Sequence, residues 1–269
     1  MIGGIVGLVG AFAVIILGSM ADGDPLSSLF SVTASIIVFG GTAAALVTQF
    51  GFAHLFGGLK RASWLFKPPN LDLHAFIDQV AEWSTIGRSQ GTLALEASLE
   101  DVTDPFQKKA LQLIVDNTPV EDLHPILANL AAEAGREDLV GGEVWEAAGG
   151  YSPTIGVMGA VLGLIHVMMR LDHPEELGAG ISTAFVATIY GVGAANLIFL
   201  PLGTRLAGMA EALERERAVM IQGFMLLAEG KSGIMIKQIL NSLVSEKKVP
   251  PPAAEAADEP LGETAEQAA

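Results

Sequence analysis

The chain has 269 residues, of which 51% are hydrophobic and 17% are charged, and its mean hydropathy is +0.47. A soluble globular domain carries about 25% charged residues, so this composition indicates a membrane protein. The sequence contains no cysteine, which excludes disulfides, Cys-ligated metal sites and thiol catalysis. With 30 acidic residues against 15 basic ones, the chain is also a poor ligand for nucleic acid.

Four stretches without Asp, Glu, Lys or Arg are long enough to cross a bilayer, for which a helix needs about 20 apolar residues. They are residues 1–21, 25–59, 147–169 and 177–204. Short charged segments join them in pairs, which predicts an all-α membrane protein with four transmembrane helices in two hairpins. A cleaved signal peptide is the alternative for the first stretch, but no Lys or Arg precedes its apolar run.

The long segment between the hairpins is predicted to form a helical domain. Its apolar residues recur at helical rather than strand spacing, as at Phe76, Val80, Trp83, Leu111, Ile114 and Val115. Prolines divide this segment into short elements: Pro68 and Pro69 after the second span, then Pro105, Pro119 and Pro125 at helix starts or turns.

After the fourth span, a helix is expected to continue with an apolar stripe through Val219, Phe224 and Leu227. The chain ends in an acidic, Ala-rich stretch without aromatic residues, which predicts disorder. The expected order is a transmembrane hairpin at 1–50, a cytoplasmic helical domain at 51–148, a second transmembrane hairpin at 149–204, a cytoplasmic helical extension at 205–248 and a disordered tail at 249–269.

Lysine and arginine mark the cytoplasmic side of a membrane protein. Seven of the 15 lie between the two hairpins, seven follow the fourth span, and Arg170 alone lies in a short loop. We therefore expect a multi-pass protein of the bacterial inner membrane whose N- and C-termini are both cytoplasmic.

The four spans offer few groups that could carry an ion. They contain hydroxyls and amides at Thr33, Thr42, Thr154, Ser182, Thr183, Thr188, Tyr190 and Asn196. An ion pathway generally needs a carboxylate at membrane depth, so a conductor built from this chain needs one from another subunit. His166 lies four residues before Arg170 and is interpreted as an interfacial histidine. No nucleophile elbow accompanies Ser182, and neither an enzyme nor a cofactor or metal site is expected.

Small residues and prolines characterise the second hairpin. The pair Gly159 and Gly163 in the third span, with Gly191, Ala194 and Ala195 in the fourth, predicts close helix packing. Pro153 suits the first turn of the third span, and Pro201 predicts a kink in the fourth, although a purely structural role accounts for Pro201 equally well.

These residues resemble the MotA/PomA family of flagellar stator subunits. Residues 151–164 (YSPTIGVMGAVLGL) resemble the family's third helix, and residues 187–191 (ATIYG), with Asn196 and Pro201, resemble its fourth. Residues 88–96 (RSQGTLALE) are similar to its cytoplasmic segment. The pattern after the fourth span is similar too, at Gly223, Gly230, Ile236, Leu240 and Leu243, with Gly233 replacing the usual proline. The resemblance covers about residues 1–246.

The resemblance implies a homo-oligomeric ring in lipid, with five copies of this chain around two copies of a MotB/PomB-type partner. That partner has one transmembrane helix with an essential aspartate and a periplasmic peptidoglycan-binding domain. Ion passage would turn the ring, and its cytoplasmic part would push a FliG-type rotor protein.

The resemblance also implies roles for single residues. Pro153 and Pro201 match the coupling prolines, and Arg88 and Glu96 match charged rotor contacts. The family's second acidic position is Ala97 here, with Glu100 further on. The expected ion pathway comprises Thr188, Ala160 and Thr154. Sodium-type members carry threonine where Ala160 stands, and Na⁺ needs several oxygen ligands, so H⁺ is the expected ion.

Two alternatives remain at this point. A TolQ/ExbB-type proton-driven energiser shares the last hairpin but has three spans. A self-contained transporter should show internal repeats or intramembrane charges of its own, and a passive membrane scaffold would lack a partner's aspartate.

Overall fold

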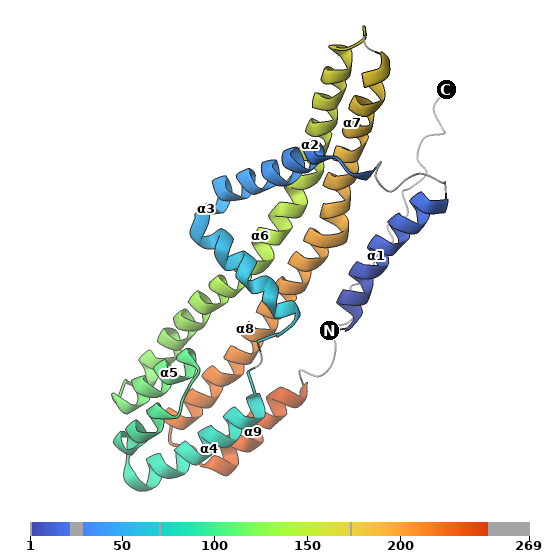
Figure 1. Ribbon diagram of the computed structural model, residues 1–269. Coiled ribbons are helices and arrows are strands. Elements are labelled where there is room, and N and C mark those ends of the chain that lie inside the picture. Colours follow the sequence, from blue (N-terminus) through green and yellow to red (C-terminus); the bar gives the residue numbers. More distant parts are fainter. Residues whose placement is uncertain (1, 22–28, 70, 173, 247–269) are drawn as a thin grey trace, which may run out of the picture. The chain divides into compact units, whose positions relative to one another are not determined.

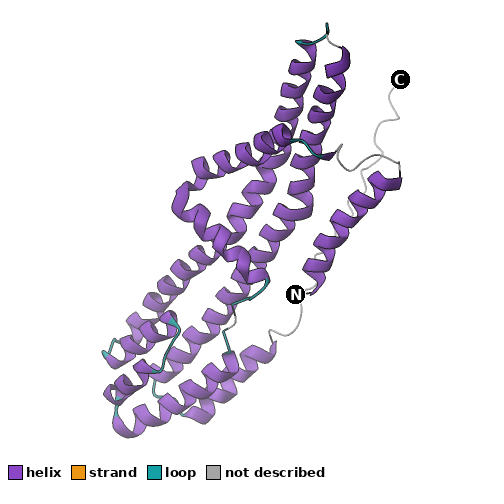
Figure 2. Ribbon diagram, in the orientation of Figure 1, coloured by secondary structure: helices purple, strands orange, loops and turns teal. Residues whose placement is uncertain are grey.

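The computed structural model describes residues 2–21, 29–69, 71–172 and 174–246. These described residues are helical apart from short turns and loops, and no strand occurs among them (Figure 2). The predicted all-α class is therefore confirmed. The first short loop, at 22–24, and the predicted acidic tail lie outside the described residues.

The chain divides into two compact units. Unit 1 comprises Met1–Leu71 and Ala128–Arg217, and unit 2 comprises Asp72–Leu127 and the chain from Ala218 onward. Within the described residues, three helical runs are long and apolar enough to cross a membrane: Val32–Leu65, Val120–Met168 and Gly180–Ala228.

Unit 1 begins with helix α1 (Ile2–Ala21). After the first loop, α2 (Val32–Ser35) continues through a π-helical turn, η2 (Ile36–Gly40), into α3 (Gly41–Arg61). The α3 helix bends sharply (Figure 1), because Gly51 inside it has a φ of 69°, which L side chains rarely adopt. A short 3₁₀ turn, η3 (Ala62–Leu65), follows.

The second hairpin of unit 1 consists of two long antiparallel helices (Figure 1). One is α6 (Val120–Met168). The other runs through α7 (Pro174–Ala194), a π-helical turn η5 (Ala195–Phe199) and α8 (Leu200–Ala228). The expected boundaries at 148/149 and 204/205 fall inside α6 and α8, so no break in the helix marks either of them.

The two helices of this hairpin approach closely at small residues. A Cβ added at Gly156 would lie 2.8 Å from the carbonyl oxygen of Ala187, and one at Gly163 would lie 2.9 Å from the Ala184 Cβ. Further along, a Cβ at Gly142 would lie 3.0 Å from the Ala207 Cβ. We call this contact line the glycine seam. Its α6 members recur every seven residues, at Gly142, Gly149, Gly156 and Gly163.

Unit 2 is a helical domain with an aromatic centre. It contains α4 (Leu73–Gln90), the 3₁₀ helix η4 (Thr92–Glu100), α5 (Pro105–Val115) and α9 (Gly233–Glu246). The Phe224 ring lies 5.4 Å from that of Phe76 and 6.1 Å from that of Trp83. The predicted apolar positions of this region and of the α8 stripe are confirmed as buried: Phe76, Val80, Trp83, Leu111, Ile114, Val115, Val219, Phe224 and Leu227.

Not every proline delimits a helix: Pro125, expected at a helix start or turn, lies inside α6, and Pro201 lies inside α8. Pro105 begins α5, where the Asp104 carboxylate accepts a hydrogen bond from the Gln107 N–H, and Pro119 immediately precedes α6. Pro153 does not start a helix as expected. It lies inside α6, because the apolar packing of the hairpin continues without a break from the helix before it.

Candidate functional site

The expected ion-pathway residues Ala160 and Thr188 lie at the same level of the second hairpin. Each directly follows a small residue at which the two helices approach, Gly159 on α6 and Ala187 on α7, and a Cβ on Gly159 would lie 3.0 Å from the Ala187 Cβ. Both residues are partly buried. The Thr188 hydroxyl donates a long hydrogen bond of 3.5 Å to the Ala184 carbonyl, one turn earlier in the same helix.

Thr154 lies apart from this level. It is six residues before Ala160, about 9 Å along the helix axis. Its side chain is exposed, and its hydroxyl donates to the Tyr151 carbonyl at 2.8 Å. The structure therefore brings two of the three expected pathway residues to one level and leaves the third beyond it.

The surroundings of Ala160 and Thr188 are apolar. The exposed face of α6 at this depth carries Val157, Met158, Val161, Leu164 and Ile165. Among the described residues, no group of three or more His, Asp or Glu is arranged to hold a metal ion. At this level the Thr188 hydroxyl donates to a backbone carbonyl, so a bound cation would need a carboxylate from outside the hairpin.

Pro153 and Pro201 lie near one another along the hairpin. A Cβ added at Gly149, one turn before Pro153, would lie 2.5 Å from the Cγ of Leu200, which immediately precedes Pro201. Proline provides no N–H, so Pro153 leaves the Gly149 carbonyl without its helical donor. Both helices therefore have weakened backbone hydrogen bonding at the same level of the seam.

A π-helical turn directly precedes Pro201, and the kink expected there stays a prediction. The residues before this proline form η5, in which the Leu200 N–H donates to the Ala195 carbonyl, five residues back. The Asn196 side-chain amide donates to the Val192 carbonyl at 2.9 Å. A π turn accommodates one more residue than an α-helical turn, so the helix continues past Pro201 without ending.

Hydrogen bonds from hydroxyl groups hold the helices around this site together, and the residue types alone do not reveal their partners. Ser152 is fully buried, and its hydroxyl donates to the Gly191 carbonyl at 3.1 Å. The Tyr190 hydroxyl donates to the Leu29 carbonyl at 2.7 Å, which ties the start of the second span to α7. His166 is exposed near the end of α6, and its interfacial role stays a prediction.

A charged cluster joins three helices at the other end of unit 1. Asp138 on α6 is 9% exposed, and its carboxylate lies 2.7 Å from the Arg217 guanidinium and 3.8 Å from that of Arg61. The Arg61 Nε and Arg217 Nη1 atoms are buried without a hydrogen-bond partner. This cluster could not be predicted, because nothing in the local sequence links the two arginines to Asp138.

The expected rotor-contact residues lie together in unit 2. Arg88 is exposed in the last turn of α4, and Glu96 and Glu100 are exposed on η4, which follows directly. Among the described residues, none of the three forms an ion pair. Arg88 also borders an open cavity of about 630 Å³ between α4 and α9, where the Lys237 ammonium pairs with Asp78 at 2.6 Å.

Comparisons with known proteins agree with these features. The MotA/TolQ/ExbB proton channel family matches residues 98–218. Motility protein A of Bacillus subtilis (strain 168) is 32% identical over 241 residues, which cover 88% of each chain. A chain of the C. jejuni MotAB structure superposes with a TM-score of 0.79 at 28% identity, covering 90% of this chain and 94% of that one. A chain of the flagellar MotAB stator complex from Bacillus subtilis gives 0.78 at 32% identity, covering 91% and 96%.

The chain therefore belongs to the MotA/TolQ/ExbB proton channel family. It is a multi-pass membrane protein, consistent with its three long apolar helical runs. Its similarity to motility protein A along most of both chains places it among the flagellar stator subunits of that family.

Proposed function

We propose that this chain forms the ring of an ion-driven flagellar stator around a single-span MotB/PomB-type partner that carries an intramembrane aspartate. The observation that carries this proposal is the apolar level of Ala160 and Thr188, in a hairpin whose residues 147–169 and 177–204 contain no Asp, Glu, Lys or Arg. The similar solved structures are MotAB complexes, which supports a partner of this kind.

The proposed topology has four spans, with α1 as the first and both termini in the cytoplasm. The concentration of Lys and Arg between and after the hairpins supports this orientation. The proposed assembly has five copies of this chain around two partner helices in the inner membrane.

The chemistry proposed for the ring follows from the second hairpin. The partner's aspartate would be expensive to keep charged against an apolar surface, so its neutralisation by an ion favours movement along that surface. Thr188 supplies the hydroxyl nearest the path, and Pro153 and Pro201 place the weakened backbone hydrogen bonds where the hairpin must flex. Unit 2 then transmits the movement to a FliG-type rotor protein through Arg88, Glu96 and Glu100.

The test of this proposal is co-production of the chain with such a partner in cells that lack their own stator. We expect the two proteins to purify together and to restore swimming. Failure to swim despite a stable complex would contradict the proposal. Restoration of envelope energisation in its place would support a TolQ/ExbB-type energiser, although the similarity to motility protein A extends well beyond the matched region 98–218.

Swimming driven by this complex is expected to depend on protons. Ala160 offers no oxygen, and the Thr188 hydroxyl is directed to a backbone carbonyl, so too few ligands are present to replace the hydration shell of Na⁺. Swimming speed should therefore persist when sodium is replaced by potassium and should collapse when a protonophore is added. Strict dependence on sodium at constant membrane potential would overturn the proton assignment and leave the stator assignment intact.

Reversal of one charge at the proposed rotor contact should reduce swimming without unfolding the protein. Arg88→Glu changes an exposed side chain that has no ion pair among the described residues, so its stability effect should remain within about 0.5 kcal/mol. Lys109→Glu is the matched control, because Lys109 is an exposed cation on α5 of the same unit. The diameter of the swimming ring in soft agar should decrease for Arg88→Glu and stay normal for the control. Equal swimming by both variants would refute the contact.

A further inference from the structure

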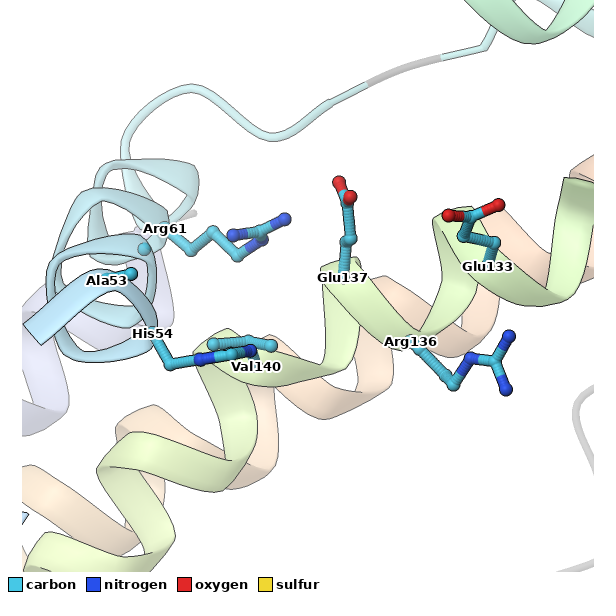
Figure 3. Close-up of a pocket in the computed structure, with 8 residues that line it drawn as sticks. Ala53, His54, Arg61, Glu133, Arg136, Glu137 and Val140 are labelled. Carbon is cyan, nitrogen blue, oxygen red and sulfur yellow. The ribbon is translucent and has the colours of Figure 1, made fainter. Parts of the chain in front are cut away.

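An open cavity of about 450 Å³ lies between α3 and α6 of unit 1 (Figure 3). Its α3 side includes His54 and Arg61, and its α6 side includes Glu133, Arg136 and Glu137. The cavity is unrelated to the expected ion pathway or to the rotor contact. Its volume falls within the range typical of sites for small molecules or head groups.

Charges of both signs line this cavity with unused hydrogen-bonding capacity. Glu133 and Glu137 extend from the same side of α6, one turn apart, and Arg61 reaches from α3 toward Glu137 (Figure 3). Neither glutamate forms an ion pair with any described residue. Arg61 is 3.8 Å from Asp138, which lies closer to Arg217, and the Arg61 Nε has no partner.

The cavity lies where the second apolar run ends. Gly51 breaks α3 with its positive φ, and the helix then presents Phe52 and Phe56, which are 66% and 64% exposed and one turn apart. The first basic residues of the chain, Lys60 and Arg61, follow immediately. Basic side chains that directly follow an apolar run are typical of the level of lipid head groups.

We infer that this cavity binds the head group of a zwitterionic phospholipid with a primary ammonium, such as phosphatidylethanolamine. Arg61 holds the phosphate, Glu133 and Glu137 accept hydrogen bonds from the ammonium, and the acyl chains lie along Phe52 and Phe56. The lining sets two arginines against two glutamates, which favours a zwitterion over an anionic lipid. The inference rests on the proposed membrane placement of α3 and is independent of any action on a rotor.

The two glutamates make a specific prediction about the ligand. A primary ammonium donates three hydrogen bonds, whereas the quaternary ammonium of phosphatidylcholine donates none. Loss of one charge-assisted hydrogen bond weakens binding about tenfold or more. Phosphatidylethanolamine should therefore bind at least about tenfold more tightly than phosphatidylcholine with the same acyl chains.

Native mass spectrometry of the full-length chain, purified with its partner and titrated with each lipid, tests this expectation. In Glu133→Gln combined with Glu137→Gln, the preference should fall to about one. The matched control combines Glu143→Gln with Glu214→Gln, two exposed glutamates of unit 1 outside the cavity, and should keep the full preference. Intrinsic tryptophan fluorescence on heating verifies that both double variants remain folded.

A second series needs no variant. Mono-, di- and trimethylated forms of phosphatidylethanolamine should bind the unaltered protein with stepwise weaker affinity. Equal binding of the whole series, or an undiminished preference in Glu133→Gln with Glu137→Gln, would overturn the inference.

Displacement of the lipid by soluble phosphoethanolamine at matched concentration would instead assign the cavity to a soluble ligand. Loss of swimming with intact lipid preference would count against the proposed motor function and not against the lipid site.

Discussion

Asp138→Asn is expected to destabilise the protein by about 3–5 kcal/mol, because it leaves two mostly buried guanidinium groups without a carboxylate. Asp138 lies between Arg217 at 2.7 Å and Arg61 at 3.8 Å, and these three residues come from α6, α8 and α3. Asparagine keeps the size of the side chain and removes only its charge. Denaturant unfolding of the purified protein, followed by tryptophan fluorescence, measures the loss.

Glu143→Gln is the control for this substitution, since it neutralises an exposed carboxylate on the same helix. Its effect should remain within about 0.5 kcal/mol. Replacing all three charges together, with Asp138→Leu, Arg61→Met and Arg217→Met, should cost less than Asp138→Asn alone, because no charge is then left buried and unpaired. If Asp138→Asn is no more harmful than Glu143→Gln, the cluster contributes nothing to the stability of unit 1.

Gly191→Ala should separate the helices of the second hairpin and abolish swimming. A Cβ at Gly191 would collide with the Ser152 carbonyl oxygen and lie 2.9 Å from the Gly156 Cα. These are backbone atoms, which cannot rotate aside as a side chain can, so the helices must move apart. Overpacking of this kind costs typically 1–3 kcal/mol. Thermal unfolding of the purified chain, together with swimming in soft agar, gives both readouts.

Gly193→Ala provides a control two residues further along the same helix. No atom lies within 4 Å of a Cβ at Gly193, and alanine is the better helix former by about 1 kcal/mol. The two substitutions are therefore expected to change stability in opposite directions. A Gly191→Ala protein as stable as the Gly193→Ala protein would show that the seam can relax without cost.

The sequence was sufficient to predict the helical class and much of the core. Periodicity identified Phe76, Val80 and Trp83 as buried, because an amphipathic helix needs only its own spacing to define the face it buries. The same local reasoning failed at Pro153. A proline at the start of an apolar run is read as a helix start, whereas the packed hairpin holds it inside α6.

The candidate site was predictable only in part. Family resemblance led to Ala160 and Thr188, which lie at one level of the hairpin, and the small-residue pair Gly159 and Gly163 does contact α7. The pairing of Asp138 with two distant arginines depends on tertiary contacts between helices. No local pattern of residue types contains that information.

The glycine seam also has a mechanical consequence. Where Gly156 meets Gly191, the contact joins backbone to backbone, and no flexible side chain lies between the two helices. Sliding α7 along α6 would force each small residue past the next one on the facing helix. The close contacts oppose this movement at every turn. The seam therefore opposes sliding of α7 along α6, so a force along the axis of one helix is transmitted to the other.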